Sequence, residues 1–171
     1  MVLTMTTMTD YIIRIAEDGL FAAIAAIGFA TISNPPRKAY LYCALIAAAG
    51  HAVRFVLMHN AMGGVHIIYA SFAASLVVGI LAVLFAPRAK FPAETCFFPA
   101  LLPMIPGMYA YRTVEALVLC LVSNLDETDY NHYFYLFSSN GLICTFIVFS
   151  LVVGATIPIF IFKRLSFQAT R

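Results

Sequence analysis

The chain has 171 residues, of which 63% are hydrophobic and 11% are charged, and its formal net charge is +2. Soluble domains carry about 25% charged residues, so a water-soluble fold cannot accommodate this composition. The length leaves room for several membrane spans of about 20 residues each and excludes an additional soluble catalytic domain. The sequence therefore predicts an all-α, polytopic integral membrane protein with a helical bundle.

The first predicted span covers residues 11–32 and follows a flexible tail, residues 1–10, that is rich in threonine and methionine. The tail lacks the basic region of a signal peptide, so we expect the span to be retained. Arg14, Glu17 and Asp18 lie near its start, and Arg14 can pair with either acid on one helix face. This cluster either reaches water at the outer interface or places a carboxylate in the membrane, and Asp18 is the deeper of the two acids.

The second predicted span, residues 39–58, carries His51 and Arg54 on one face because they are three residues apart. Small residues precede them in Ala47–Gly50 and permit another helix to approach closely. Two interpretations stay open at this point. His51 is a packing residue and Arg54 reaches the outer interface, or the two together bind a carboxylate or relay a proton.

The third predicted span covers residues 67–86, and the fourth segment, residues 91–122, is too long for one straight crossing, at roughly 48 Å. Pro103, Pro106 and Gly107 interrupt it in the sequence Pro-Met-Ile-Pro-Gly. Irregular backbone at membrane depth occurs where it is buried in protein or lines a wet cavity. Transporters place such breaks at their substrate sites. We therefore expect a broken span with a substrate site at these residues.

Polar residues follow the break directly. Tyr111 and Glu115 share a helix face, and Arg112 can pair with Glu115 three residues on. A helix that begins near Gly107 would also direct free N–H groups and its positive dipole end into the cavity, which suits a carboxylate. Tyr111, Arg112 and Glu115 are thus candidate substrate ligands. The alternative is a packing kink with a structural Arg112–Glu115 pair.

The distribution of basic residues predicts the orientation of five spans, the last at residues 136–162. With five crossings, one side holds all the basic loop residues, and the other holds the acidic loop 123–135. The positive-inside rule then places the N-terminus outside and the C-terminal tail, residues 165–171, in the cytoplasm. A re-entrant hairpin would reverse this arrangement, so a single broken crossing is preferred. The basic residues are Arg37, Lys38, Arg88, Lys90, Lys163, Arg164 and Arg171.

Other functional classes find little support in the sequence. The four cysteines are scattered singly in apolar stretches, and the histidines match no metal-binding spacing. Phosphate loops, nucleophile elbows and basic patches for nucleic acid are likewise missing from the sequence. We therefore expect no enzyme activity, no cofactor, no metal site and no nucleic-acid partner.

The chain resembles the small, five-span membrane subunit of the threonine/serine exporter (ThrE) family over roughly residues 12–164. The resemblance implies one transmembrane domain, residues 11–164, in a bacterial cytoplasmic (inner) membrane, with a larger membrane subunit of the same family as partner in a hetero- or homo-oligomer. It also implies proton-linked export of threonine, serine or a dicarboxylate such as succinate. Asn140 matches the family pattern and joins the candidate substrate-binding residues. The resemblance is carried by Asp18, Gly28-Phe29, Asn34-Pro35-Pro36, Cys43-Ala44-Leu45, Gly50-His51 with Arg54, Pro103–Gly107 with Ala110-Tyr111, Asn140 and Ile157-Pro158.

The leading hypothesis is accordingly a subunit of a secondary exporter for a small carboxylated metabolite. The substrate would bind at the break, and Asp18 with His51 would carry the coupling proton, with Arg54 and Glu17 as further polar candidates in the membrane. Two rivals remain. One is an assembly subunit without a substrate site of its own, and the other is a homo-oligomeric channel.

Overall fold

The computed structural model describes residues 8–59, 64–122 and 126–166, and all the regular secondary structure in these ranges is helical. Four helices are long and apolar enough to cross a membrane, and a fifth crossing results if α4 and α5 form one bent span. The prediction of an all-α membrane bundle is confirmed. The sides on which the termini lie stay a prediction. In chain order the elements are α1 (Met8–Ser33), α2 (Arg37–Met58), α3 (Ile67–Ala89), α4 (Glu94–Leu101), the 3₁₀ turn η2 (Leu102–Met104), α5 (Gly107–Val122), α6 (Glu127–Ile161) and α7 (Lys163–Ser166).

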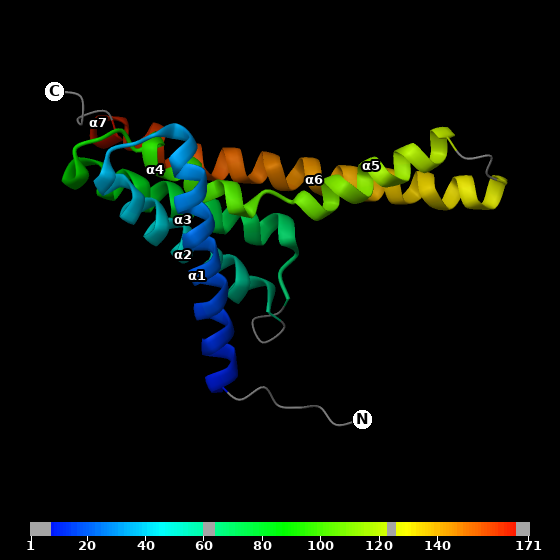
Figure 1. Ribbon diagram of the computed structural model, residues 1–171, viewed down its shortest axis with the longest axis horizontal. Coiled ribbons are helices and arrows are strands. Elements are labelled where there is room, and N and C mark those ends of the chain that lie inside the picture. The colour runs from blue at the N-terminus through cyan, green and yellow to red at the C-terminus, as the bar shows by residue number, and fades with distance from the viewer. Residues whose placement is uncertain (1–7, 60–63, 123–125, 167–171) are drawn as a thin grey trace.

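The helices form a bundle from which one hairpin projects (Figure 1). In the bundle, α1 packs on α2, α2 on α3, and α3 on α6, while α4 contacts α1, α2 and α3. Beyond the bundle, α5 leads outward and the first part of α6 returns along it, so these two segments extend away from the other helices (Figure 1). We call α5 together with residues 127–141 of α6 the arm.

Two short turns set the path between the first helices and the break. Asn34 has a positive φ of 44°, which asparagine tolerates better than most residues, and Pro36 is the N-cap residue that precedes α2. Lys90 ends α3 in the left-handed conformation, and its N–H donates to the carbonyl of Ala86 at 2.9 Å. Both turns fall where the sequence places its span boundaries.

The last long helix begins at Glu127, well before the expected start of the span near residue 136. Asp126 caps it, because its side-chain oxygen accepts from the N–H of Asp129 at 3.1 Å. Acidic residues in the first turn, Glu127 and Asp129, also complement the positive end of the helix dipole. The expectation of a loop over 123–135 is therefore wrong for residues 127–135, and residues 123–125 lie outside the described chain.

Small residues allow the bundle helices to approach closely, as expected for packing in lipid. A Cβ added to Gly79 on α3 would lie 2.5 Å from the carbonyl oxygen of Ala155 on α6. One added to Gly154 would overlap the hydroxyl of Ser75, which itself donates to the carbonyl of Ser150 at 3.1 Å. These contacts fix α3 against α6 and thereby position the helices that carry the polar residues.

The fourth segment is broken where the sequence predicts. The chain passes from α4 through η2 into α5 with a bend of 53°, so that α5 continues onward instead of folding back along α4 (Figure 1). Pro106 ends the irregular stretch, and its carbonyl accepts from the N–H groups of Tyr109 and Ala110, each at 3.1 Å. This break brings Met104, which is buried, against α2.

Candidate functional site

Asp18 on α1 and His51 on α2 form a side-chain pair inside the bundle. The Nδ1 atom of His51 lies 3.2 Å from an Oδ atom of Asp18. The helices pack closely beside the pair, since a Cβ added to Gly19 would lie 3.5 Å from the carbonyl oxygen of Ala48. The His51 side chain is 8% exposed and that of Asp18 is 37% exposed. Asp18 therefore faces an accessible space, while His51 lies behind it.

The second ring nitrogen of His51 makes no hydrogen bond to a described residue. This Nε2 atom is buried. A buried polar atom without a partner costs about 1–3 kcal/mol, so proteins retain such atoms chiefly where they have a use. The imidazole thus holds one nitrogen against Asp18, and its other nitrogen is enclosed by the bundle without a partner among the described residues.

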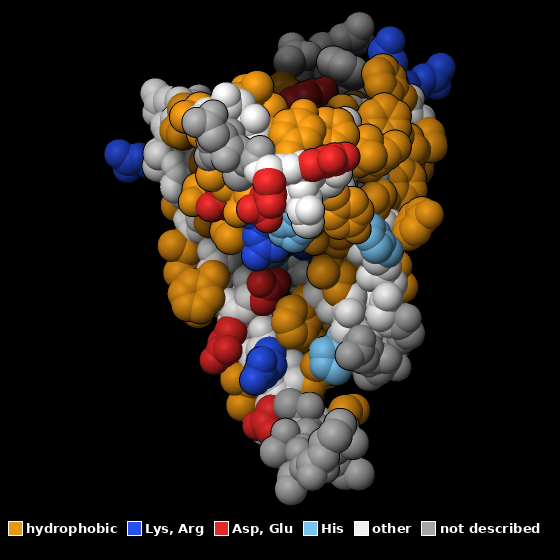
Figure 2. All heavy atoms as spheres, turned by 90° about the vertical axis from the view of Figure 1, so that its right-hand side faces the viewer, with side chains coloured by type: hydrophobic (Ala, Val, Ile, Leu, Met, Phe, Trp, Pro, Cys, Tyr) orange, Lys and Arg blue, Asp and Glu red, His pale blue; other side chains and the backbone are white. Residues whose placement is uncertain are grey.

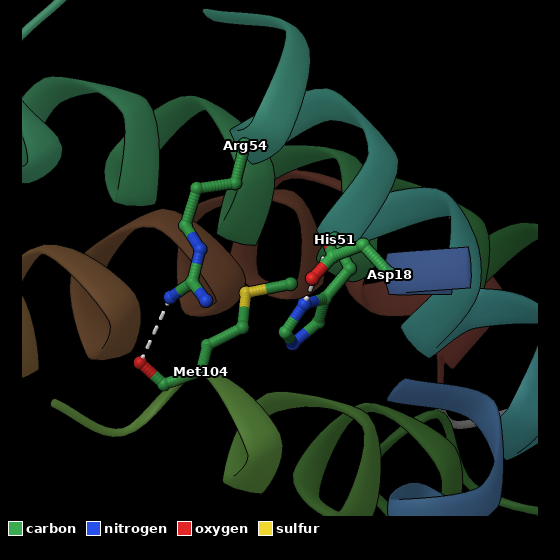
Figure 3. A network of polar contacts seen from close by, with 4 residues as sticks. All are labelled: Asp18, His51, Arg54 and Met104. Carbon is green, nitrogen blue, oxygen red and sulfur yellow. Dashed lines mark hydrogen bonds and ion pairs between the residues drawn. The ribbon is translucent and has the colours of Figure 1, made fainter. Parts of the chain in front are cut away.

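Arg54 connects the second helix to the break. Its Nη1 atom donates to the carbonyl oxygen of Met104 at 3.1 Å (Figure 3). The break frees backbone carbonyls that no helix satisfies, and an arginine supplies the missing donor. Gly50 makes room for this contact, because a Cβ there would lie 2.6 Å from the terminal methyl of Met104 and 2.5 Å from a methyl of Val78.

A pocket of about 320 Å³ opens beside this network. Asp18 and Arg54 both line it, so a carboxylate and a guanidinium border one small space with largely apolar walls. That combination suits a ligand that carries both a cationic and an anionic group, each beside its opposite charge. The remaining lining residues are Phe55, Met58 and His59.

Three residues in or beside the pocket were not identified as site residues from the sequence, namely Phe55, Met58 and Tyr11. Phe55 and Met58 lie one and four residues after Arg54, and this helical spacing was the available signal. Tyr11 on α1 packs against His59, with ring centroids 4.4 Å apart, and its hydroxyl is buried without a hydrogen-bond partner among the described residues. Aromatic rings from α1 and α2 thus gather at this end of the pocket.

The predicted substrate ligands after the break lie elsewhere, on the arm. Arg112 and Glu115 line a hollow of about 510 Å³ between α5 and α6, together with Asn140. The expected pair is not formed, because Arg112 makes no ion pair with Glu115 or with any other described residue. Asn140 donates to the carbonyl of Leu136 at 2.8 Å, and Tyr111 is 62% exposed and lies outside the hollow.

The start of α5 offers an anion fewer free N–H groups than the sequence predicts. The N–H of Gly107 donates to the carbonyl of Ile105 at 2.8 Å, and the N–H groups of Tyr109 and Ala110 are bonded to Pro106. Most of the donors expected to be free are thus engaged within the break. Pro103 and Pro106 interrupt the helix at the break, and Arg54 contacts the break through the backbone carbonyl oxygen of Met104.

The remaining polar residues of α1 are separate from the pair. Arg14 and Glu17 are exposed and line a surface depression with Asp10. The predicted pairing of Arg14 with Glu17 or Asp18 is not formed in the described structure, since Asp18 contacts His51 instead. Of the four candidates for proton coupling, the fold therefore groups Asp18, His51 and Arg54 and leaves Glu17 outside.

The chain is similar to known proteins over most of its length. Residues 18–161 match the family model described as "Threonine/Serine exporter, ThrE". An uncharacterized protein of Haemophilus influenzae is 33% identical over 157 residues, which are 92% of this chain and 50% of the relative. The chain thus spans about half the length of that relative. No solved structure matches the chain significantly.

Proposed function

Since the chain belongs to the threonine/serine exporter family, we propose that it is one subunit of a secondary exporter in a bacterial cytoplasmic membrane, and that it moves a small carboxylated metabolite out of the cell. The observation that carries this proposal is the polar network at the break. Asp18, His51 and Arg54 come together from two helices, and Arg54 binds the irregular backbone at Met104. Charged groups inside a membrane bundle mark transport pathways by default.

The pocket beside this network favours an amino acid over a dicarboxylate. Arg54 would bind the substrate carboxylate, and the carboxylate of Asp18 would bind the substrate ammonium group. Succinate carries two negative charges, so one of them would lie against Asp18 and be repelled. Threonine or serine is therefore the preferred substrate, and a dicarboxylate is the second choice.

The same contacts suggest how a proton is coupled to export. In this proposal Asp18 holds either the ammonium group of the substrate or a proton, and never both. One carboxylate that alternates between the two exchanges an outgoing substrate for an incoming proton. In this proposal the Nδ1–H group of His51 donates to ionised Asp18. When the buried Nε2 atom takes up an incoming proton, Nδ1 passes its own proton to Asp18.

A larger membrane subunit completes the transporter in this proposal. The chain spans about half the length of the Haemophilus influenzae relative. Alternating access uses paired structural halves that move against each other around a central site. The second half would close the open side of the Asp18 pocket, which lies at the surface of the described helices.

The first experiment is purification of the tagged chain from its native membrane in mild detergent, with mass-spectrometric identification of its partner. The chain and partner are then reconstituted into vesicles that contain labelled threonine, serine or succinate. We expect threonine and serine efflux to accelerate when a proton gradient drives protons inward, and an uncoupler to abolish this acceleration.

Two results would contradict the proposal and select a rival. Passive conductance by the chain alone would identify a homo-oligomeric channel. Unchanged gradient-driven export when Asp18, His51 and Arg54 are all replaced would identify an assembly subunit that contacts no substrate.

A further inference from the structure

The arm carries two opposite charges within its apolar part. Arg112 and Glu115 lie about one turn apart on α5, and both side chains are exposed. Every residue that follows, from Ala116 to Val122, is apolar, and α5 stays helical to Val122. At 1.5 Å per residue, Arg112 lies about 15 Å from the end of the helix. This is half the thickness of a hydrocarbon layer of about 30 Å.

These charges are not satisfied within the described chain. Neither residue takes part in an ion pair, and α5 buries only Ala116. Unpaired charges in contact with lipid are strongly unfavourable, so such residues face protein or water. Arg14 and Glu17 differ in this respect, because they lie near the start of α1, whose 26 residues exceed the length needed for one crossing.

We propose that the α5–α6 hollow binds the same hollow of a second copy of this chain. The surface contains its own electrostatic complement, since Arg112 and Glu115 stand side by side on it. A two-fold axis along the membrane normal keeps every residue at its own depth and brings Arg112 of each copy beside Glu115 of the other. The two residues differ in depth by about 4.5 Å, which a long arginine side chain spans. The contact surface consists of Arg112, Glu115, Ala116, Leu119, Tyr133, Leu136, Ser139 and Asn140.

The position of the arm permits this association. The arm extends away from the bundle, so a second copy meets no other helix there (Figure 1). Seen from the end of the arm, acidic, basic and histidine side chains lie among apolar ones (Figure 2). Ala116 is buried and Gly141 packs against Thr113, so these small residues hold α5 close to α6 within one copy. The proposal does not depend on transport, so its failure would leave the exporter assignment intact.

Charge reversal in trans tests the pairing. Two differently tagged copies of the full chain are expressed together, and association is measured by co-purification and by energy transfer in membranes. We expect Arg112→Glu and Glu115→Arg each to weaken self-association by about tenfold or more, because like charges then face each other. Mixing the Arg112→Glu chain with the Glu115→Arg chain should restore wild-type association. Pairing within one chain cannot explain such rescue, because each variant chain carries two like charges.

A matched pair on α1 serves as the control. Arg14→Glu and Glu17→Arg reverse exposed charges with the same spacing, and we expect them to leave association unchanged. A monomeric wild-type chain, unaltered association in both arm variants, or failure of the mixed variants to associate would each overturn the proposal.

A second measurement avoids charge reversal altogether. Leu119→Cys is introduced into a chain whose Cys120 and Cys144 are replaced by alanine, and disulfide formation between copies is induced in intact membranes. We expect crosslinked dimers for Leu119→Cys and none for Ile24→Cys, an exposed position on α1. Equal crosslinking at the two positions would contradict the arm as the interface.

Discussion

Nδ1 of His51 lies 3.2 Å from the Asp18 carboxylate, and this contact joins two helices whose residues are 33 positions apart in sequence. One turn later on the same face of α2, Arg54 binds the carbonyl of Met104 in the break. Asp18 is therefore linked to the irregular backbone of the fourth span through one face of α2, which carries both His51 and Arg54. This relationship gives specific expectations for the residues involved.

Replacement of Asp18 tests the proposed proton carrier. Asp18→Asn keeps the size of the side chain but cannot take up or release a proton and offers no negative charge to an ammonium group, so we expect gradient-driven export to fall by at least about tenfold. Expression and partner binding should be unchanged. The matched control is Glu17→Gln, which alters the neighbouring acid on the exposed face of α1. Efflux of labelled threonine from vesicles measures both, and equal effects of the two changes would rule out a special role for Asp18.

Replacement of Arg54 should affect both stability and substrate binding. Arg54→Met removes the hydrogen bond to Met104, and bonds to charged groups contribute about 1.5–3 kcal/mol. We expect a lower unfolding temperature and a rise of about tenfold or more in the KM for threonine. Arg54→Lys should give an unfolding temperature and a KM between those of the wild type and Arg54→Met, because lysine keeps the positive charge and loses the planar guanidinium group. Arg88→Met is the control, since among the described residues exposed Arg88 bonds only to the carbonyl of Leu84 within its own helix.

We expect that the break packs against α2 only when residue 50 is a glycine. Gly50→Ala places a methyl group 2.6 Å from the end of Met104 and 2.5 Å from a methyl of Val78, so these two side chains must shift. Overpacking of this kind costs about 1–3 kcal/mol. Gly28→Ala meets nothing within 4 Å and should stabilise its helix by up to about 1 kcal/mol. Size-exclusion profiles after heating in detergent compare the two, and similar midpoints would show that α2 tolerates displacement of Met104.

Gly79 tests the close packing of α3 on α6. A Cβ at this position would lie 2.5 Å from the backbone oxygen of Ala155, which cannot rotate away as a side chain can. We expect Gly79→Ala to destabilise the protein by about 1–3 kcal/mol or more. Gly141→Ala, whose nearest neighbour is a side-chain methyl of Thr113 at 3.3 Å, should cost less. The same heating assay ranks the two variants, and the reverse order would contradict the described α3–α6 contact.

The helices themselves could be predicted from the sequence. Long apolar segments with proline, asparagine and glycine between them give the first three helices, and Pro103 to Gly107 give the position of the break. The start of α6 was missed because its first turns are polar. There the helix is set by the Asp126 cap and not by hydrophobicity.

The grouping of the polar residues was only partly predictable. Spacing along one helix places His51 and Arg54 on one face, and it equally predicts an Arg112–Glu115 pair and an Arg14 pair that the structure does not form. Helical periodicity states which side chains share a face. It does not state whether that face meets another helix or the outside.

The sequence by itself determined a helical membrane protein, the place of its broken span and its family, because apolar length, backbone breakers and motif order are local properties of the chain. The tertiary structure alone decided that Asp18 meets His51, that Arg54 meets Met104, and that Arg112 and Glu115 lie on a projecting arm. Those contacts depend on how closely α1, α2 and the break approach one another, and the small residues Gly19 and Gly50 set that approach through packing across the bundle.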